Sequence, residues 1–352
     1  MDPNALSFFK KLLETPSPSG YEQQIQKVVR EYAGSFADEI STDVHGNVIL
    51  TKNPGAPMRV MFAGHCDQIG FCVQYIDAEG FLYVNAIGGW DPQVLIGQRL
   101  TVWTSSGPIF GAIARKPIHL LTDEERKQVV KMKDLWLDIG CKNKEEASEL
   151  VRVGDPVTVE LGVTLMRNNF ASSPAMDDKA GCWVAVEALR RASSKRLNCT
   201  LIAVSTVQEE IGLRGATTAS YTVNPHVGIA IDVTHATDCP TIDKKQEGDV
   251  ALGRGPVIFR GPNMNPRVVD KLVETAAAGE VPFQMAASGR ATPNDANTMQ
   301  ISRGGVATGL VSIPNRYMHS PVEMISLDDI DHAADLLAGF ALRLSRDESF
   351  VP

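Results

Sequence analysis

The most informative pattern along this chain is a set of apolar runs that stop abruptly at acidic residues or histidines. Residues 201–207 are rich in β-branched and aliphatic side chains, which is typical of a strand buried on both faces of a mostly parallel sheet. This run ends just before Glu209 and Glu210, and such strands present functional residues at their carboxyl ends. A Glu-Glu pair can also be a solvated turn, so the rest of the pattern has to decide between the two interpretations.

Other apolar runs lead to residues of the same chemical kind. Residues 59–64 lead to His65 and Asp67, and residues 227–231 lead to Asp232. Residues 309–313 lead through a short linker to His319. In addition, Asp177 and Asp178 precede a helical pattern at 180–192. If these strands lie side by side, one rim of the sheet carries both histidines and up to six carboxylates. The positive end of a helix could by itself explain the two aspartates, but it does not explain the other groups.

So much negative charge in one crevice repels itself unless it is compensated, and two divalent cations are the simplest compensation. Imidazole and carboxylate ligands suit zinc, cobalt or manganese. A carboxylate has two oxygens and can bridge two ions, so we expect one aspartate between them. Neighbouring residues at a strand end point in different directions, so of Glu209 and Glu210 one can bind a cation while the other stays free as a base.

The periodicity divides the chain into an α/β part and a β-rich part. Helices are predicted at residues 1–13, 21–32, 180–192, 266–278 and 327–343. Between residue 70 and about 160, short strands at 71–75, 81–84, 99–104 and 109–113 are punctuated by Gly and Pro, with helical pieces at 120–133 and 142–150.

Because the β-rich segment separates His65 from Asp177, it must be an insertion if both residues serve one site. The predicted fold is therefore α/β, with a mostly parallel central sheet flanked by helices and an inserted small β-rich domain. The expected division is 1–69 and 161–352 for the catalytic α/β domain and 70–160 for the insertion.

Composition narrows the function classes. With 352 residues, 43% of them hydrophobic, the chain is long enough for a large core and two domains, and its net charge of -8 argues against nucleic-acid binding. No apolar run approaches the length of about 18 residues that a membrane span needs. The N-terminus lacks the pattern of a signal peptide, and the six cysteines show no CxxC spacing, so we expect a cytoplasmic protein with reduced thiols.

The motifs resemble those of the TET and glutamyl aminopeptidases, a family of dinuclear metallo-aminopeptidases. They are GHCDQIG at 64–70, MDDKAG at 176–181, QEEIGLRG at 208–215, DVTH at 232–235 and RYMHSP at 316–321. The resemblance covers nearly the whole chain, because residues 88–99 and 116–121 of the inserted segment are also similar. Five motifs in the same order with this spacing make the resemblance specific.

The resemblance implies a role for each motif residue. Asp177 would bridge two divalent ions per subunit, zinc or cobalt. His65 and Asp232 would complete the coordination of one ion, and Glu210 and His319 that of the other. Glu209 would be the general base, and Asp67 would orient the imidazole of His65. It also implies peptide substrates with a free N-terminus, an insertion that is a PDZ-like dimerisation domain, and a homo-oligomer in the form of a hollow tetrahedral dodecamer. The chain departs from the family pattern at Cys66, at Gln68 and in residues 289–296.

Three alternatives remain open at this point. A related dinuclear deacylase or carboxypeptidase would not require a free α-amino group, and a peptide-binding scaffold would have lost its metals. A sugar hydrolase that uses two carboxylates would leave the histidines without a catalytic role.

His119 has no carboxylate cluster around it and is a weaker ligand candidate. The preferred N-terminal residue also stays open, because Lys244, Lys245 and Arg290 could favour acidic side chains or simply be solvated.

Overall fold

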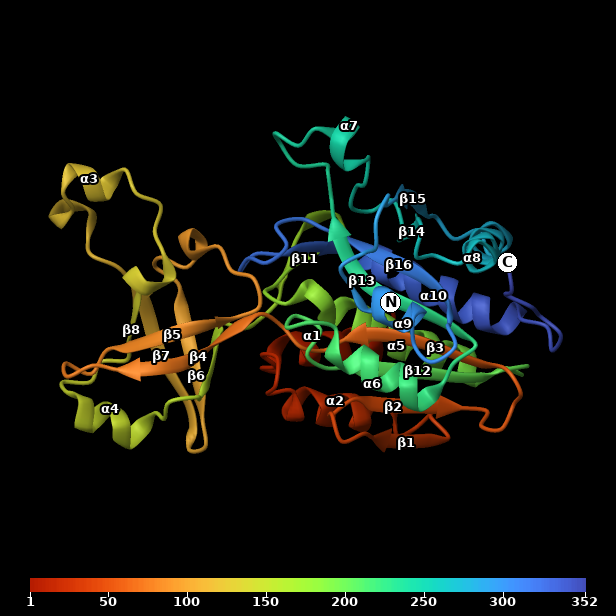
Figure 1. Cartoon of the computed structure of the whole chain (residues 1–352), viewed down its shortest axis with the longest axis horizontal. Helices are drawn as coiled ribbons and strands as arrows, with labels where there is room; N and C mark the ends of the chain where they lie inside the picture. Colours follow the sequence, from red (N-terminus) through yellow and green to blue (C-terminus); the bar gives the residue numbers. More distant parts are fainter.

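The computed structural model describes all of residues 1–352, and its centre is an eight-stranded sheet (Figure 1). In spatial order the strands are β1 (Glu39–Thr42), β2 (Val48–Lys52), β12 (Thr200–Thr206), β3 (Arg59–His65), β13 (Val227–His235), β16 (Ala307–Asn315), β14 (Val257–Arg260) and β15 (Gln284–Ala287). The four central strands, from β12 to β16, are parallel to one another, and β14 is parallel to β15, whereas the remaining pairs are antiparallel. The predicted α/β architecture with a mostly parallel central sheet is confirmed.

Helices cover both faces of this sheet (Figure 1). On one face α1 (Pro3–Glu14), α2 (Gln23–Ala33), α5 (Met176–Ser193), α8 (Pro266–Ala278) and α10 (Leu327–Arg343) pack against one another and the strands, whereas α6 (Arg214–Val223) and α9 (Asp295–Gln300) pack together on the other. Every residue of β12 is buried, as its uninterrupted apolar run predicted. No helix is both long and apolar enough to cross a membrane, and all six cysteines are free.

A closed six-stranded barrel stands beside this layered part (Figure 1). Its strands, in the order in which they pair, are β4 (Gly70–Ile76), β5 (Leu82–Ile87), β8 (Trp136–Asp138), β7 (Gly107–Ala114), β6 (Arg99–Thr104) and β9 (Pro156–Val159). The barrel has its own core of 15 buried residues, separate from the 66-residue core around the large sheet. We refer to residues 70–159 as the barrel segment.

One predicted helix is largely wrong. Of residues 120–133 only α3 (Asp123–Arg126) is α-helical, beginning at a capping box formed by Thr122 and Glu125. Most of the segment has no apolar face to bury: Leu120 is 67% exposed and Val129 65% exposed, and Val130 and Met132, near its end, pack against the barrel core. Capping alone starts a turn, but without packing against a core the helix does not continue. The other predicted helix of this segment forms as α4 (Lys144–Leu150).

A small three-stranded sheet joins distant parts of the chain. It contains β10 (Thr164–Leu165), β11 (Phe170–Ser172) and β17 (Met324–Ser326). Strand β11 pairs antiparallel with β17, and Ser172 lies opposite Met324. The residues that follow β11 and those that precede β17 therefore lie side by side. The remaining helix, α7 (Lys244–Glu247), lies in an excursion after β13 that stands away from the large sheet (Figure 1).

Candidate metal centre

The predicted site residues converge at the carboxyl ends of the central strands. His65 is the last residue of β3, and it lies opposite Thr206, the last residue of β12, so the chain that leaves β12 carries Glu209 and Glu210 to the same edge. Asp232 lies in β13, and its backbone neighbour across the ladder is Ser312 of β16. Parallel strands of an open sheet end at one edge, where α/β proteins bind their ligands.

A cavity of about 610 Å³ opens at this edge. Its lining includes five of the seven predicted site residues: Asp177, Glu209, Glu210, Asp232 and His319. His65 and Asp67 are buried next to it. Further along the wall lie Phe259, Arg290 and Asn294, so residues 289–296, where the chain departs from the family pattern, do contribute to this cavity.

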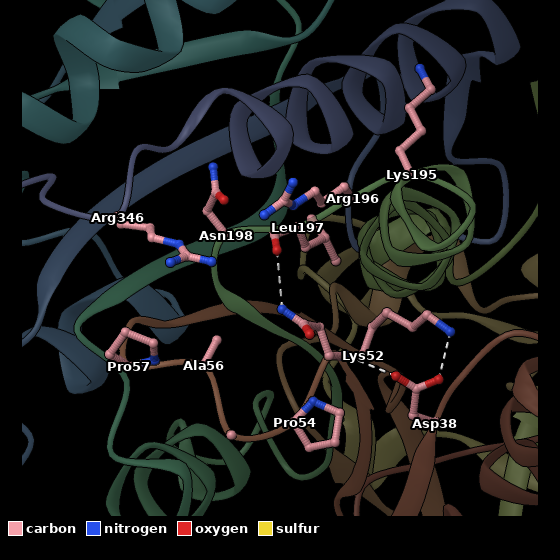
Figure 2. A pocket seen from close by; sticks show the side chains of 12 residues that line it. Asp38, Lys52, Pro54, Ala56, Pro57, Lys195, Arg196, Leu197, Asn198 and Arg346 are labelled. Carbon is pink, nitrogen blue, oxygen red and sulfur yellow. Dashed lines mark hydrogen bonds and ion pairs between the residues drawn. The ribbon is translucent and has the colours of Figure 1, made fainter.

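A second cavity, of about 630 Å³, lies at the amino ends of β3 and β12 (Figure 2). Its charged side chains are Lys52, Lys195, Arg196 and Arg346 together with Asp38, whose carboxylate is paired with Lys52 at 2.5 Å. Size does not distinguish the two cavities, but chemistry does. This basic cavity contains no histidine and no unpaired carboxylate, so of these two cavities only the one at the carboxyl ends has the donors that a divalent cation needs.

Asp177 lies between the two imidazole rings. Its Oδ1 atom is 3.1 Å from Nε2 of His65, and its Oδ2 atom is 3.2 Å from Nε2 of His319. Nε2 of His319 is also 3.4 Å from Oε2 of Glu210, while Nε2 of His65 is 4.0 Å from Oδ1 of Asp232. One carboxylate with a ring at each oxygen is the arrangement expected of a group that bridges two ions.

Asp67 organises the two glutamates rather than only the histidine. Its carboxylate accepts hydrogen bonds from the backbone N–H of Glu209 at 3.0 Å, from that of Glu210 at 3.2 Å, and from the hydroxyl of Ser19 at 2.6 Å. Nδ1 of His65 is 3.4 Å from the Asp67 carboxylate and 3.1 Å from its backbone carbonyl. With Nδ1 engaged by residue 67, Nε2 of His65 faces Asp177.

The electrostatics of the cluster reflect crowded negative charge. Burial raises the pKa of Glu209 to about 10, with the charges of Asp232 and Asp295 adding to the rise, and burial together with Asp177 raises the pKa of Asp232 to about 8. Burial would lower the pKa of His65, but the surrounding carboxylates raise it well above its usual value. The groups therefore hold protons that divalent cations could replace.

The donor set fits metal ions. Two groups of three side chains, His65 with Asp177 and Glu210, and His65 with Asp178 and Asp232, have ligand atoms that all lie within 4.8 Å of one another. Oε1 of Glu210 is buried without any hydrogen-bond partner, which is costly unless another ligand engages it. The oxygens of Asp178 accept hydrogen bonds from the backbone N–H groups of Gly181 and His65, at 3.0 and 3.2 Å, so we interpret Asp178 as a support for the His65 backbone.

Sequence reasoning missed two buried acidic residues at this site. Asp295 accepts a hydrogen bond from Thr206 at 2.7 Å while its other oxygen has no partner. Glu323 accepts hydrogen bonds from two backbone N–H groups within the site. The acidic position within residues 289–296 was a usable signal for Asp295, whereas no periodic pattern marks Glu323. His119, the weaker ligand candidate, is exposed on the barrel segment and lies outside the cluster.

Comparison with known proteins identifies similar chains. The family described as M42 glutamyl aminopeptidase matches residues 46–336. The lysyl aminopeptidase of Pyrococcus furiosus is 38% identical over 332 residues, which cover 93% of this chain and 94% of that protein. The solved structure of a TET aminopeptidase from a marine sediment archaeon of the Thaumarchaeota has a TM-score of 0.91 at 34% identity and covers 97% of this chain and 96% of its own.

A further solved structure bears on assembly. It belongs to the TET1 peptidase of Pyrococcus horikoshii, which is described as able to assemble into a tetrahedron or a large octahedral shell. Its TM-score is 0.85 at 30% identity, and the match covers 97% of this chain and all (100%) of the other. The likeness therefore includes the barrel segment as well as the layered part.

Proposed function

Because the chain belongs to the M42 glutamyl aminopeptidase family and is therefore a peptide hydrolase of the aminopeptidase class, we propose that it removes N-terminal residues with two divalent metal ions. The observation that carries the proposal is the position of Asp177, whose two oxygens lie 3.1 and 3.2 Å from the Nε2 atoms of His65 and His319. Asp177 would bridge the ions. His65 and Asp232 would complete the coordination of one ion, and Glu210 and His319 that of the other. Zinc and cobalt suit this donor set.

When bound, the two ions would polarise the scissile carbonyl and acidify the attacking water. The residues of the chain hold the reactants around them. Carboxylates line the cavity on the ligand side, so a free, positively charged α-amino group is attracted to that side. This favours cleavage one residue at a time from the N-terminus.

Glu209 is the proposed general base. It lines the cavity, and its Oε2 atom is 3.8 Å from Nε2 of His65, so it is close to the proposed ions without belonging to their ligand set. Burial raises its pKa, and neighbouring cations would lower it toward the working pH, where a base is most effective. Glu209 would take a proton from the attacking water and later give it to the leaving amine.

We also propose that the barrel segment is a PDZ-like dimerisation domain and that the chain forms a tetrahedral dodecamer. Support comes from the likeness, over 97% of the chain, to the peptidase described as forming a tetrahedron. Light scattering of the purified protein would test this directly, with a mass of twelve subunits as the expected result.

Substitution of the two neighbouring glutamates separates the proposed roles. Glu209→Gln should keep both ions and lower kcat by about 100- to 10,000-fold, because it removes proton transfer. Glu210→Gln should weaken metal binding first, and part of its activity should return when metal is added. Metal content and hydrolysis of aminoacyl chromogenic substrates are the measurements.

The same assay distinguishes the alternative functions. Chelator should abolish the wild-type activity, and zinc or cobalt should restore it; activity that resists chelation would contradict the two-metal proposal. Acetylated substrates should not be cleaved. Equal cleavage of free and acetylated substrates would instead indicate a deacylase or another amidohydrolase.

A further inference from the structure

Glu323 is a buried carboxylate that connects two of the proposed ligands without facing the cavity. Its Oε2 atom accepts a hydrogen bond from the backbone N–H of Asp177 at 2.9 Å, and its Oε1 atom accepts one from the backbone N–H of His319 at 2.7 Å. The residue is only 1% exposed and does not line the cavity. Both oxygens are therefore already engaged by the chain itself.

The small sheet explains why these segments meet. Because β11 and β17 pair with Ser172 opposite Met324, residues 173–177 and 319–323 run beside each other where they leave the ladder. The backbone N–H of Ser173 donates to the carbonyl of Glu323 at 3.0 Å and extends this pairing by one residue. Glu323 is thus fixed at its backbone before its side chain reaches the two amides.

His319 needs such support more than the other proposed ligands do. Its φ is 59°, in the left-handed region that non-glycine residues seldom adopt and that persists only when the surroundings enforce it. Its side chain is 36% exposed, so packing does little to fix the ring. The hydrogen bond from its own N–H to Glu323 is one of the contacts that hold this backbone conformation.

We propose that Glu323 is a positioning residue that sets the spacing between Asp177 and His319, and thereby the affinity of the ion which these two residues share. A carboxylate that spans two backbone donors fixes their separation in a way that a single hydrogen bond cannot. This inference rests on the two-metal function proposed above. It assigns to Glu323 no contact with metal or substrate.

The decisive variant is Glu323→Gln, which keeps the shape but presents an NH₂ group to one of the two backbone N–H donors. We expect the affinity for one of the two ions to fall by about 10- to 100-fold, as for other groups that orient metal ligands, while the other ion binds within about threefold of wild type. Chelator competition with cobalt or zinc measures both affinities. At saturating metal, kcat should return toward wild type and KM for the peptide should change little.

Asp329 offers a matched control. It is also a fully buried carboxylate whose two oxygens accept backbone N–H groups, from Gly253 at 2.8 Å and Gly255 at 2.7 Å, but it is not among the predicted site residues and does not line the cavity. Asp329→Asn should lower the thermal midpoint and leave both metal affinities unchanged. Comparison of the two variants separates a positioning role from a general loss of stability.

The metal affinities of the variants decide whether Glu323 has this positioning role. Metal affinities of Glu323→Gln that match those of Asp329→Asn would overturn it. If Glu323→Gln does not fold, Glu323→Asp keeps the charge but withdraws it by one methylene, and it should show the same selective weakening; unchanged affinities in that variant would likewise overturn the role. Wild-type protein that binds no metal would refute the proposed function itself, which is a different result from wild-type binding that Glu323 does not influence.

Discussion

His65 and His319 face the same carboxylate from opposite sides, but different parts of the molecule hold them. His65 ends a buried central strand and its side chain is 2% exposed, whereas His319 lies in a loop beyond β16 and is 36% exposed. Close packing fixes the first ring in addition to two hydrogen bonds, from its backbone N–H to Asp178 and from Nδ1 to the carbonyl of Asp67. The second depends on hydrogen bonds, through its backbone N–H to Glu323 and through Nδ1 to the carbonyl of Gly89 at 2.9 Å.

This comparison separates a strand half of the site from a loop half. The strand half consists of His65 and Asp232, and the loop half of Glu210 and His319, with Asp177 between them. Packing interactions are many and individually small, so the strand half should change little when one contact is removed. The loop half depends more on a few directional bonds, which single substitutions can remove or displace.

The largest effect is expected where the two halves meet. Asp177→Asn leaves one oxygen and no charge, so the side chain can no longer bridge two ions. We expect the loss of at least one ion and a fall in kcat/KM of about 1000-fold or more, since metal stabilisation of the transition state is worth several kcal/mol. Metal analysis and steady-state kinetics measure both quantities. A variant that kept two ions and activity within tenfold would show that the halves do not share this residue.

A smaller and asymmetric effect should follow from removal of each histidine. His65→Ala opens a hole in a buried, carboxylate-rich position, and we expect added metal to restore little of its activity. His319→Ala leaves a solvent-accessible ligand position that water can fill, so millimolar cobalt or zinc should restore much of the activity. Metal titration of kcat for both variants is the test, and equal recovery would contradict the distinction between the buried and the exposed histidine.

The strand half is also the half that the sequence predicts well. Uninterrupted apolar runs mark β3, β12 and β13, and the residues that follow or end such runs lie at one edge of a parallel sheet. The same periodicity predicts α8 and α10 with the bounds that they have in the structure. In these elements burial decides the conformation, and burial leaves a pattern in the sequence.

The supports of the loop half leave no such pattern. The pairing of β11 with β17 joins two strands of three residues each that are more than 150 positions apart, and Glu323 acts through backbone amides that any residue could supply. The contact between Gly89 and His319 depends on where the barrel segment docks. The ligand roles themselves stay predictions, although the structure brings all seven predicted side chains together.

The smallest effect tests whether the barrel segment helps to hold the loop half. A Cβ atom added at Gly89 would lie 3.2 Å from Nδ1 of His319, which is close enough to displace the ring by a few tenths of an ångström, and this glycine has no left-handed backbone that alanine would strain. Gly89→Ala should therefore weaken one metal site by about 10-fold, the lower end of the range for groups that orient ligands. Gly304→Ala is the control, because a Cβ there meets nothing within 4 Å. Chelator competition on both variants measures the metal affinities. Equal affinities would mean that His319 does not depend on the barrel segment for its orientation. Glu323 and packing within the layered part would then be enough to orient the ring.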